Sequence, residues 1–288
     1  MNKNKTNINW YPGHMAKTKR EIKEKLDLID VVIEVIDARI PFSSKNNDIN
    51  DVIKSKPRIL VMTKIDLCDM ELTKLWKTYY ERNGYNVILI DLINGKNVNS
   101  IVSEVIKVGS YVNEKRRLKG LKDRKIRALV LGIPNVGKST LINRLVSKKV
   151  TNTGNRPGVT KSLEWIRVNK DIELLDSPGI LWPKLDNNTV ALNLASMTAI
   201  KEEILNRESV TIYIINTLVK YYKDSFINRY KISIDNFDDI VLILDSIGKY
   251  IGAVRNGEVD YERVYVTVLK DLRDGYFGGV TFDRYEDR

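Results

Sequence analysis

The segment GIPNVGKST, residues 132–140, has the residue types and spacing of a loop that binds phosphate groups. It follows the apolar run IRALVL, which is typical of a buried strand, and it leads into a helical pattern. Its glycines let the backbone curl so that successive N–H groups point at phosphate oxygens. We therefore expect Lys138 to hold the β and γ phosphates of a nucleotide and the Ser139 hydroxyl to bind Mg²⁺. Further phosphate contacts are expected from Asn135, Val136, Gly137 and Thr140.

A second loop, DSPG at residues 176–179, ends another run of the strand type, DIELLD. The metal-side loop of nucleotide hydrolases has this context, so Asp176 is expected to reach Mg²⁺ and the Gly179 N–H to sense the γ phosphate. Thr160 lies between the two loops in the stretch RPGVTK. We expect it to close on Mg²⁺ and the γ phosphate, and an ordinary loop threonine is the alternative.

The tetrapeptide TKID, Thr63 to Asp66, follows the buried-type run RILVMT. The Asp66 carboxylate can accept hydrogen bonds from both N1–H and N2–H₂ of guanine, a pair of donors that adenine lacks, while the Lys64 stem covers the ring. Paired, charge-assisted hydrogen bonds discriminate between ligands by about a few kcal/mol. Together with the two phosphate-side loops, this motif predicts GTP and GDP rather than ATP as the nucleotides.

The guanine loop precedes the phosphate loop in this chain, which is the reverse of the usual order. A pocket on the carboxyl ends of parallel strands is assembled in space, so it tolerates a change in strand order, with new termini opened in an exposed loop. In the permuted order, the segment that leaves DSPG leads directly into the C-terminal part of the chain. We interpret this as a mechanical connection, through which the nucleotide state sets the orientation of the C-terminal part of the chain.

Strand-like and helix-like runs alternate through the first two thirds of the sequence. Strands are predicted at 31–37, 58–63, 87–91 and 126–132, with a hairpin of 163–168 and 171–176; helices are predicted at 15–29, 48–54, 69–83 and 98–107. This alternation predicts an α/β fold, a mostly parallel sheet with helices on both faces. After residue 185 only helical patterns remain, at 192–205, 210–226, 239–252 and 260–274. We expect a GTPase domain at 1–185, with a basic extension at 1–28, and a small all-α domain at 186–288.

The composition favours a polyanionic partner. The formal net charge is +11, and residues 107–127 hold nine Lys and Arg against two Asp and Glu. From residue 187 onward the balance is acidic, thirteen basic residues against sixteen. Cys68 is the only cysteine, so we expect a small buried hydrophobe and a reducing compartment. With no apolar run of membrane length, we predict a cytoplasmic monomer without membrane association.

The motif order TKID, GIPNVGKST, GVT, DSPG, with YPGHMAK near the N-terminus and DARIPFSS after the first strand, resembles the circularly permuted GTPases of the ribosome biogenesis GTPase A (YlqF) type. The resemblance covers nearly the whole chain. It implies a GTPase that binds the maturing large ribosomal subunit in the GTP state, through rRNA and ribosomal proteins. The subunit then stimulates hydrolysis, which releases the protein, and a helical C-terminal domain contacts rRNA.

Two features depart from that family. The guanine-side loop is DLINGK at 91–96 rather than a small Ser-rich loop, so we expect backbone groups near Leu92 to touch the base. The acidic C-terminal part implies that RNA contacts there rest on local patches such as Arg229 and Lys231.

The residue after DSPG is Ile180, where many GTPases have a glutamine that orients the attacking water. An apolar side chain cannot polarise water, so another group is needed. The only histidine, His14, in what we expect to be a flexible PGHM segment, is our catalytic candidate beside Lys138 and Thr160; a structural or exposed histidine is the alternative. Asn135 resembles the asparagine that lends an oxygen to K⁺ in potassium-dependent GTPases. An ordinary turn residue is the alternative for Asn135.

Three other functions stay open on the sequence alone. A GTPase could act on another RNA target such as the small ribosomal subunit. An RNA-binding scaffold could keep a purely structural nucleotide pocket, although Lys138, Ser139 and Asp176 are all present. The basic stretches could also bind a membrane surface, but no aromatic-rich amphipathic anchor accompanies them.

Overall fold

The computed structural model of the chain describes residues 13–46, 49–53, 56–146, 163–181, 187–200, 206–232 and 237–287. Its first part alternates helices and strands, as predicted. The elements are α1 (Gly13–Lys25), the 3₁₀ turn η1 (Leu26–Leu28), β1 (Val31–Asp37), α2 (Asn50–Ile53), β2 (Arg58–Thr63), α3 (Met70–Arg82), β3 (Asn86–Leu89), α4 (Val98–Leu118), β4 (Ile126–Leu131), α5 (Lys138–Leu145), β5 (Glu164–Arg167) and β6 (Ile172–Asp176). None of the helices in the described ranges is both long and apolar enough to span a bilayer.

The six strands form one sheet in the order β3-β2-β1-β4-β6-β5, and every pairing is parallel except that of β5 with β6. The carboxyl ends of β1, β2, β4 and β6 therefore meet at one edge of the sheet. The loops that begin at Ala38, Lys64, Gly132 and Ser177 leave from this edge. A crevice outside the carboxyl ends of parallel strands is where such sheets bind ligands.

Helices cover both faces of the sheet, which confirms the predicted α/β class. All seven residues of β1 are buried, and alternate side chains point to opposite faces. Ile33 and Val35 belong to an apolar cluster with α4 and α5. Val32 packs with residues of α1 and α2, and Ile36 packs with Trp76 of α3.

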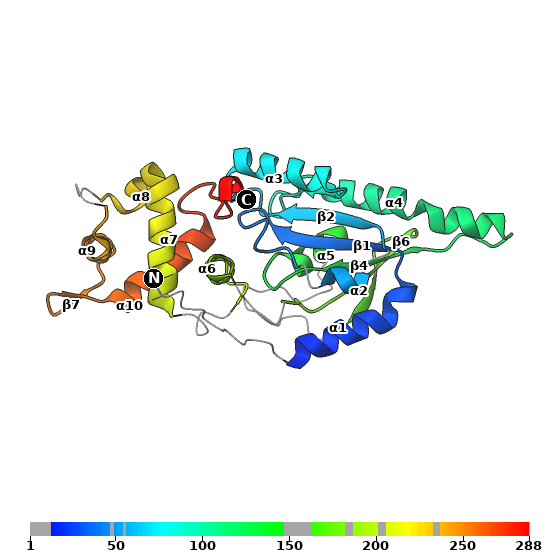
Figure 1. Ribbon diagram of the computed structural model, residues 1–288, viewed down its shortest axis with the longest axis horizontal. Coiled ribbons are helices and arrows are strands. Elements are labelled where there is room, and N and C mark those ends of the chain that lie inside the picture. The colour runs from blue at the N-terminus through cyan, green and yellow to red at the C-terminus, as the bar shows by residue number, and fades with distance from the viewer. Residues whose placement is uncertain are drawn as a thin grey trace.

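The described residues after 187 are mainly helical, and they include one two-stranded ribbon. Its elements are α6 (Asn188–Ser196), α7 (Arg207–Tyr221), α8 (Lys223–Tyr230), α9 (Ile240–Tyr250), β7 (Val254–Arg255), β8 (Glu258–Val259), α10 (Tyr261–Asp274) and the 3₁₀ turn η4 (Tyr285–Asp287). Figure 1 shows α7 to α10 gathered at one end of the molecule and α4 projecting at the other.

Several predicted boundaries were wrong. The helix predicted at 98–107 continues to Leu118, since apolar residues keep their helical spacing through Val112. The helix predicted at 192–205 begins earlier, because the Asn187 side chain caps the N–H groups of residues 189 and 190, and it ends at Ser196. The helix predicted at 210–226 is two helices, because Tyr222 leaves the helical conformation with φ −137°.

The end of the chain folds back onto the sheet-bearing part. The Val280 N–H donates to the Leu67 carbonyl (3.0 Å), and the Phe282 N–H donates to the Arg39 carbonyl (2.7 Å). The indole N–H of Trp76 donates to the Asp283 carbonyl (3.0 Å). The C-terminal residues are thus part of the surroundings of the β1 and β2 loops, and Figure 1 shows this end beside α3.

Candidate nucleotide-binding site

The phosphate loop links the buried strand β4 directly to α5. Gly137 has φ 95°, a conformation that disfavours side chains, and an added Cβ would lie 3.0 Å from Leu92. The Lys138 amino group is buried and donates to the Ile133 carbonyl of the loop (2.6 Å). Burial lowers the pKa of Lys138 to about 8, against the opposing effect of the Asp176 carboxylate. The lysine is thus already turned back over the loop, where phosphate oxygens would meet it.

The DSPG loop is bound to the phosphate loop. Asp176 ends β6 beside Val130 of β4, and it is buried. The Ser177 hydroxyl donates to the Val130 carbonyl (2.7 Å), and the Ile180 N–H donates to the Gly132 carbonyl (3.1 Å). A Cβ at Gly179 would lie 2.7 Å from the Pro134 nitrogen, so only glycine allows this approach.

The residues on this side fit Mg²⁺. Ser139 is the second residue of α5, which directly follows the loop, and the Asp176 carboxylate acts electrostatically on the adjacent Lys138, so a hydroxyl and a carboxylate both adjoin this end of the loop. No group of three His, Cys, Asp or Glu in the described ranges could hold a metal by itself. Such a sparse donor set suits an Mg²⁺ that keeps most of its bonds to phosphate and water.

The TKID loop is joined to the phosphate loop by two side chains. The Thr63 hydroxyl donates to the Val136 carbonyl (2.6 Å), and the Lys64 amino group donates to the Asn135 carbonyl (2.7 Å). Lys64 has φ 59°, which carries Asp66 past the strand end to an exposed position. Although the residue is exposed, neighbouring protein atoms partly desolvate its carboxylate, and this desolvation, together with the nearby Asp91 carboxylate, raises the pKa of Asp66. The three motifs that are far apart in sequence are therefore neighbours in the fold.

Sequence reasoning assigned no role to Asp37, which the structure places at the centre of this arrangement. Its carboxylate is buried and accepts from the Arg39 backbone N–H (3.0 Å), from the Arg39 guanidinium (3.0 and 2.8 Å) and from Lys64 (2.8 Å). Burial acts to raise its pKa, but the two cations lower it well below the usual range. Asp37 thus fixes the lysine of the guanine loop. Its position at the carboxyl end of a fully buried strand is the sequence signal that could have identified it.

The guanine-side loop at 91–96 is held against α5. The Asp91 carboxylate accepts from the N–H groups of Ile93 (2.8 Å) and Asn94 (3.0 Å), which closes a tight turn. Arg144 of α5 donates to the carbonyls of Leu92 (3.0 Å) and Ile93 (2.6 Å). Among the described residues, the Leu92 N–H donates to no protein atom. That N–H is therefore a donor still open to a ligand.

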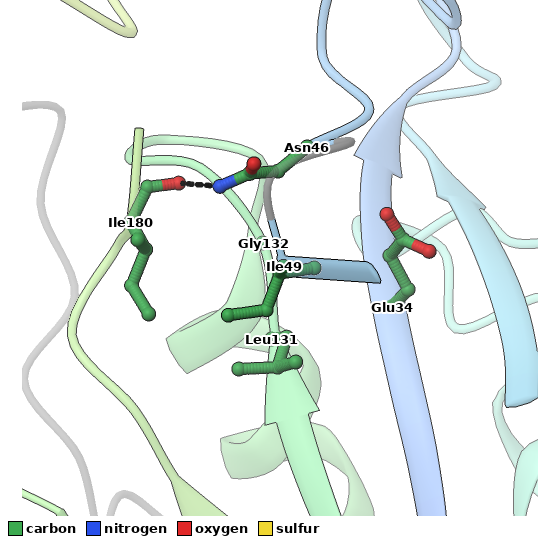
Figure 2. Close-up of a pocket in the computed structure, with 6 residues that line it drawn as sticks. All are labelled: Glu34, Asn46, Ile49, Leu131, Gly132 and Ile180. Atoms are coloured by element: carbon green, nitrogen blue, oxygen red, sulfur yellow. Dashed lines mark hydrogen bonds between the residues drawn. The ribbon is translucent and has the colours of Figure 1, made fainter. Parts of the chain in front are cut away.

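Ile180 faces the protein interior. It is 4% exposed and belongs to the apolar cluster of α1, α2 and β4. Figure 2 shows its side chain at a small cavity that Glu34, Asn46 and Leu131 also line. The Asn46 amide donates to the Ile180 carbonyl (2.9 Å). The residue after DSPG is thus held at both its N–H and its carbonyl, and its side chain is unable to act on a water at the phosphates.

Of the predicted catalytic residues Thr160 and His14, the structure describes the backbone position of His14 alone. Thr160 lies outside the described residues. His14 lies in the first turn of α1, so the segment predicted to be flexible is helical from Gly13 onward. The next residue, Met15, is buried, and its sulfur accepts from the Leu181 N–H (3.5 Å). The start of α1 therefore packs against the segment that leaves DSPG.

Asn135 contacts the helical part of the chain. It has φ 62°, and its side-chain amide donates to the Thr198 carbonyl, just after α6 (2.5 Å). This contact and the conformation fit the turn interpretation, and the donor side of the amide is occupied.

The fold and the four converging loops define a P-loop GTPase in which the guanine loop comes first in the chain. The sequence pattern of a family described as "50S ribosome-binding GTPase" matches residues 127–250. The chain is 44% identical to Ribosome biogenesis GTPase A of Bacillus licheniformis, over 97% of this chain and 99% of that protein. It also resembles the GDP-bound structure of YlqF (TM-score 0.66, 26% identity, 93% of this chain and 100% of that one). For GNP-bound YlqF from Thermotoga maritima, the TM-score is 0.64 at 25% identity over 93% of this chain and 98% of that one. The protein belongs to the ribosome biogenesis GTPase A family.

Proposed function

We propose that this GTPase acts in late assembly of the large ribosomal subunit. In the GTP state it binds the pre-50S particle, through rRNA and ribosomal proteins, and hydrolysis stimulated by the particle releases it. The observation that carries the proposal is the match of residues 127–250 to a 50S ribosome-binding GTPase family, within a site whose nucleotide loops converge. The protein acts as a cytoplasmic monomer.

The nucleotide contacts are assigned as follows. Asp66 recognises guanine, Lys64 and Thr63 hold its loop against the phosphate loop, and the Leu92 N–H meets the carbonyl oxygen of the base. The phosphates lie on the N–H groups of Asn135, Val136, Gly137, Lys138, Ser139 and Thr140, with the Gly179 N–H at the γ phosphate. Ser139, Thr160 and Asp176 hold Mg²⁺, which neutralises phosphate charge.

Hydrolysis needs a group that Ile180 cannot supply. His14 is that group: the packing of Met15 on Leu181 brings the start of α1 to the segment after DSPG. Lys138 and Thr160 stabilise charge at the γ phosphate. The Asn135 side-chain oxygen is available to a K⁺ beside the phosphates, because the amide nitrogen is the atom that contacts Thr198.

The central experiment measures GTP turnover with and without large subunits, in equimolar KCl and NaCl. We expect stimulation by large subunits and higher turnover in KCl. His14→Ala should lose the stimulated turnover while GTP affinity is unchanged; full retention rejects the catalytic role of His14. Sedimentation of the GTP-bound protein with separated subunits tests the target, and association with small subunits alone rejects the proposal.

The chain divides at residue 185, and residues 186–288 form a domain whose orientation follows the nucleotide state. The contact of Asn135 with Thr198 supports it, because the phosphate loop touches the first residues beyond α6. The C-terminal residues also return to Arg39 and Leu67. The domain at 186–288 therefore contacts the GTPase domain near both its beginning and its end.

A further inference from the structure

Positive charge gathers where α4 ends and the chain turns back to β4. Residues 114–125 hold seven Lys and Arg against two acidic residues. Lys115, Arg116 and Arg117 form the last turn of α4, and Lys119, Lys122, Arg124 and Lys125 follow in the connection. The nucleotide site uses none of these residues.

Part of this charge is neutralised within the protein and part is not. Arg117 pairs with Asp123 (2.6 Å), and Arg124 pairs with Asp30 (2.7 Å). Lys115, Lys119 and Lys122 are exposed, and Lys125 is half-buried; these four make no ion pair with any described residue. We call these four lysines the basic platform.

The backbone under the platform is fixed. The Asn113 side chain donates to the Arg124 carbonyl (3.0 Å) and accepts from the Arg124 N–H (3.0 Å). The Arg116 guanidinium donates to the Lys122 carbonyl (2.7 Å). These hydrogen bonds hold the connection against α4. A ligand that binds there therefore loses little free energy to ordering of the backbone.

The platform lies at the opposite edge of the sheet from the nucleotide. Its connection enters the amino end of β4, whereas the phosphate loop leaves the carboxyl end six residues later. Six strand residues span about 20 Å. The platform therefore cannot serve the bound GTP. It also lies at the end of the molecule opposite to α7–α10 (Figure 1).

We propose that the basic platform binds the phosphate backbone of an RNA duplex; the inference rests on the proposed function in that this RNA is ribosomal. Lysines act as point charges on phosphate. The exposed apolar residues beside them, Leu118 and Leu121, are aliphatic. The aromatic ring at the platform, that of Tyr111, is half-buried: Lys115 Nζ lies over it at 5.5 Å from the centroid, and its hydroxyl donates to the Asp30 carbonyl (3.1 Å). This arrangement favours contact with phosphates over stacking of a splayed base.

The helical part offers less for this purpose. It is net acidic, and the Arg229 guanidinium, one of the two patch residues expected to contact RNA, is engaged by Asp271 (2.9 Å) and lies over the Tyr276 ring. A basic contact surface at the end of α4 accounts for how a chain with an acidic C-terminal part binds a polyanion. The bound RNA would then lie against the sheet-bearing part of the protein as well.

The test compares two double variants of the full chain. Lys119→Gln/Lys122→Gln removes two platform charges, and Lys74→Gln/Lys77→Gln removes two lysines of α3 that already pair with Glu71 and Glu81. Binding to an RNA duplex of about 20 base pairs is titrated over a range of KCl concentrations. We expect the platform variant to lower the slope of log K against log[KCl] by about 2 and the affinity by about tenfold or more, and the control to match wild type. GTP turnover without RNA should be the same in all three proteins.

Equal slopes for the two variants overturn the inference, as does a wild-type protein that does not bind the duplex. A loss confined to phosphatidylglycerol vesicles, with duplex binding intact, also overturns it and assigns the platform to a membrane surface. If duplex binding depends on the platform but wild type ignores large subunits, the inference holds and the proposed function fails.

Discussion

The side-chain amide of Asn135 in the phosphate loop donates to the carbonyl of Thr198, just after α6 (2.5 Å). Thr198 has φ 58°, a left-handed conformation that costs a β-branched residue about 1–3 kcal/mol. The strain is compensated by its surroundings, in which the Thr198 N–H donates to the Ala195 carbonyl (2.9 Å). The contact joins the part of the chain that follows DSPG to the predicted phosphate loop.

We predict that Thr198→Pro changes the dependence of GTP hydrolysis on potassium, although Thr198 lies outside the nucleotide loops. Proline fixes φ near −65° and removes the N–H, so the carbonyl moves away and Asn135 loses its orientation. If Asn135 lends an oxygen to K⁺, the ratio of GTP turnover in KCl to that in NaCl should fall about tenfold. Thr198→Gly keeps the left-handed backbone and is the matched control, with an unchanged ratio. A proline variant with the wild-type ratio would contradict the coupling.

Asp37→Asn should destabilise the protein by about 3–5 kcal/mol at neutral pH, because Arg39 and Lys64 lose their buried counterion. The folded-state pKa of Asp37 is depressed below its unfolded value, so its contribution is present above about pH 4 and is lost as the pH falls through the folded pKa. Urea unfolding should therefore give a constant difference from wild type between about pH 5 and 8. A difference that already shrinks within that range would count against the assignment.

Asp283 and Asn193 should prove energetically coupled. The Asp283 carboxylate accepts from the N–H groups of Phe42 (2.8 Å) and Ser43 (2.7 Å) and from the Asn193 amide (2.9 Å). Asp283→Ala leaves these donors buried, so we expect a loss of about 3 kcal/mol in unfolding free energy. A double-mutant cycle with Asn193→Ala should give a coupling of about 1–2 kcal/mol.

The control for that cycle is Asp274→Ala, since Asp274 is exposed at the end of α10. Its change should stay within about 0.5 kcal/mol. Additive effects of the Asp283 and Asn193 substitutions would show that the C-terminal residues do not bind α6 to the loop after β1.

Cys68 should resist alkylation in the folded protein. It is 5% exposed, and burial raises the pKa of its thiol to about 11 from a usual value near 9. Two pKa units reduce the reactive thiolate about a hundredfold, so iodoacetamide at about pH 8 should modify native protein at least a hundredfold more slowly than urea-unfolded protein. Mass spectrometry of quenched samples measures both rates. Comparable rates would place the thiol at the surface.

Local pattern was sufficient to locate the strands of the sheet. The runs at 31–37 and 58–63 form strands with the predicted bounds, and the run predicted at 171–176 forms a strand from 172 to 176, because runs rich in apolar and β-branched residues favour buried strands. The local sequence pattern predicted the ends of the helices less well. The left-handed Thr198 after α6 and the break at Tyr222 depend on neighbours that come from distant parts of the chain.

The sequence by itself determined the chemical groups of the site and their permuted order, since glycine spacing and strand-ending carboxylates act through the local backbone. Only the tertiary structure decided which partners those groups meet. It placed Asp37 against Lys64, turned Ile180 into the core, committed Arg229 to Asp271, and brought Thr198 and Asp283 to the loops after β4 and β1. These contacts join residues that lie far apart in the chain or on separate elements, and they depend on how sheet and helices pack, which no local periodicity encodes.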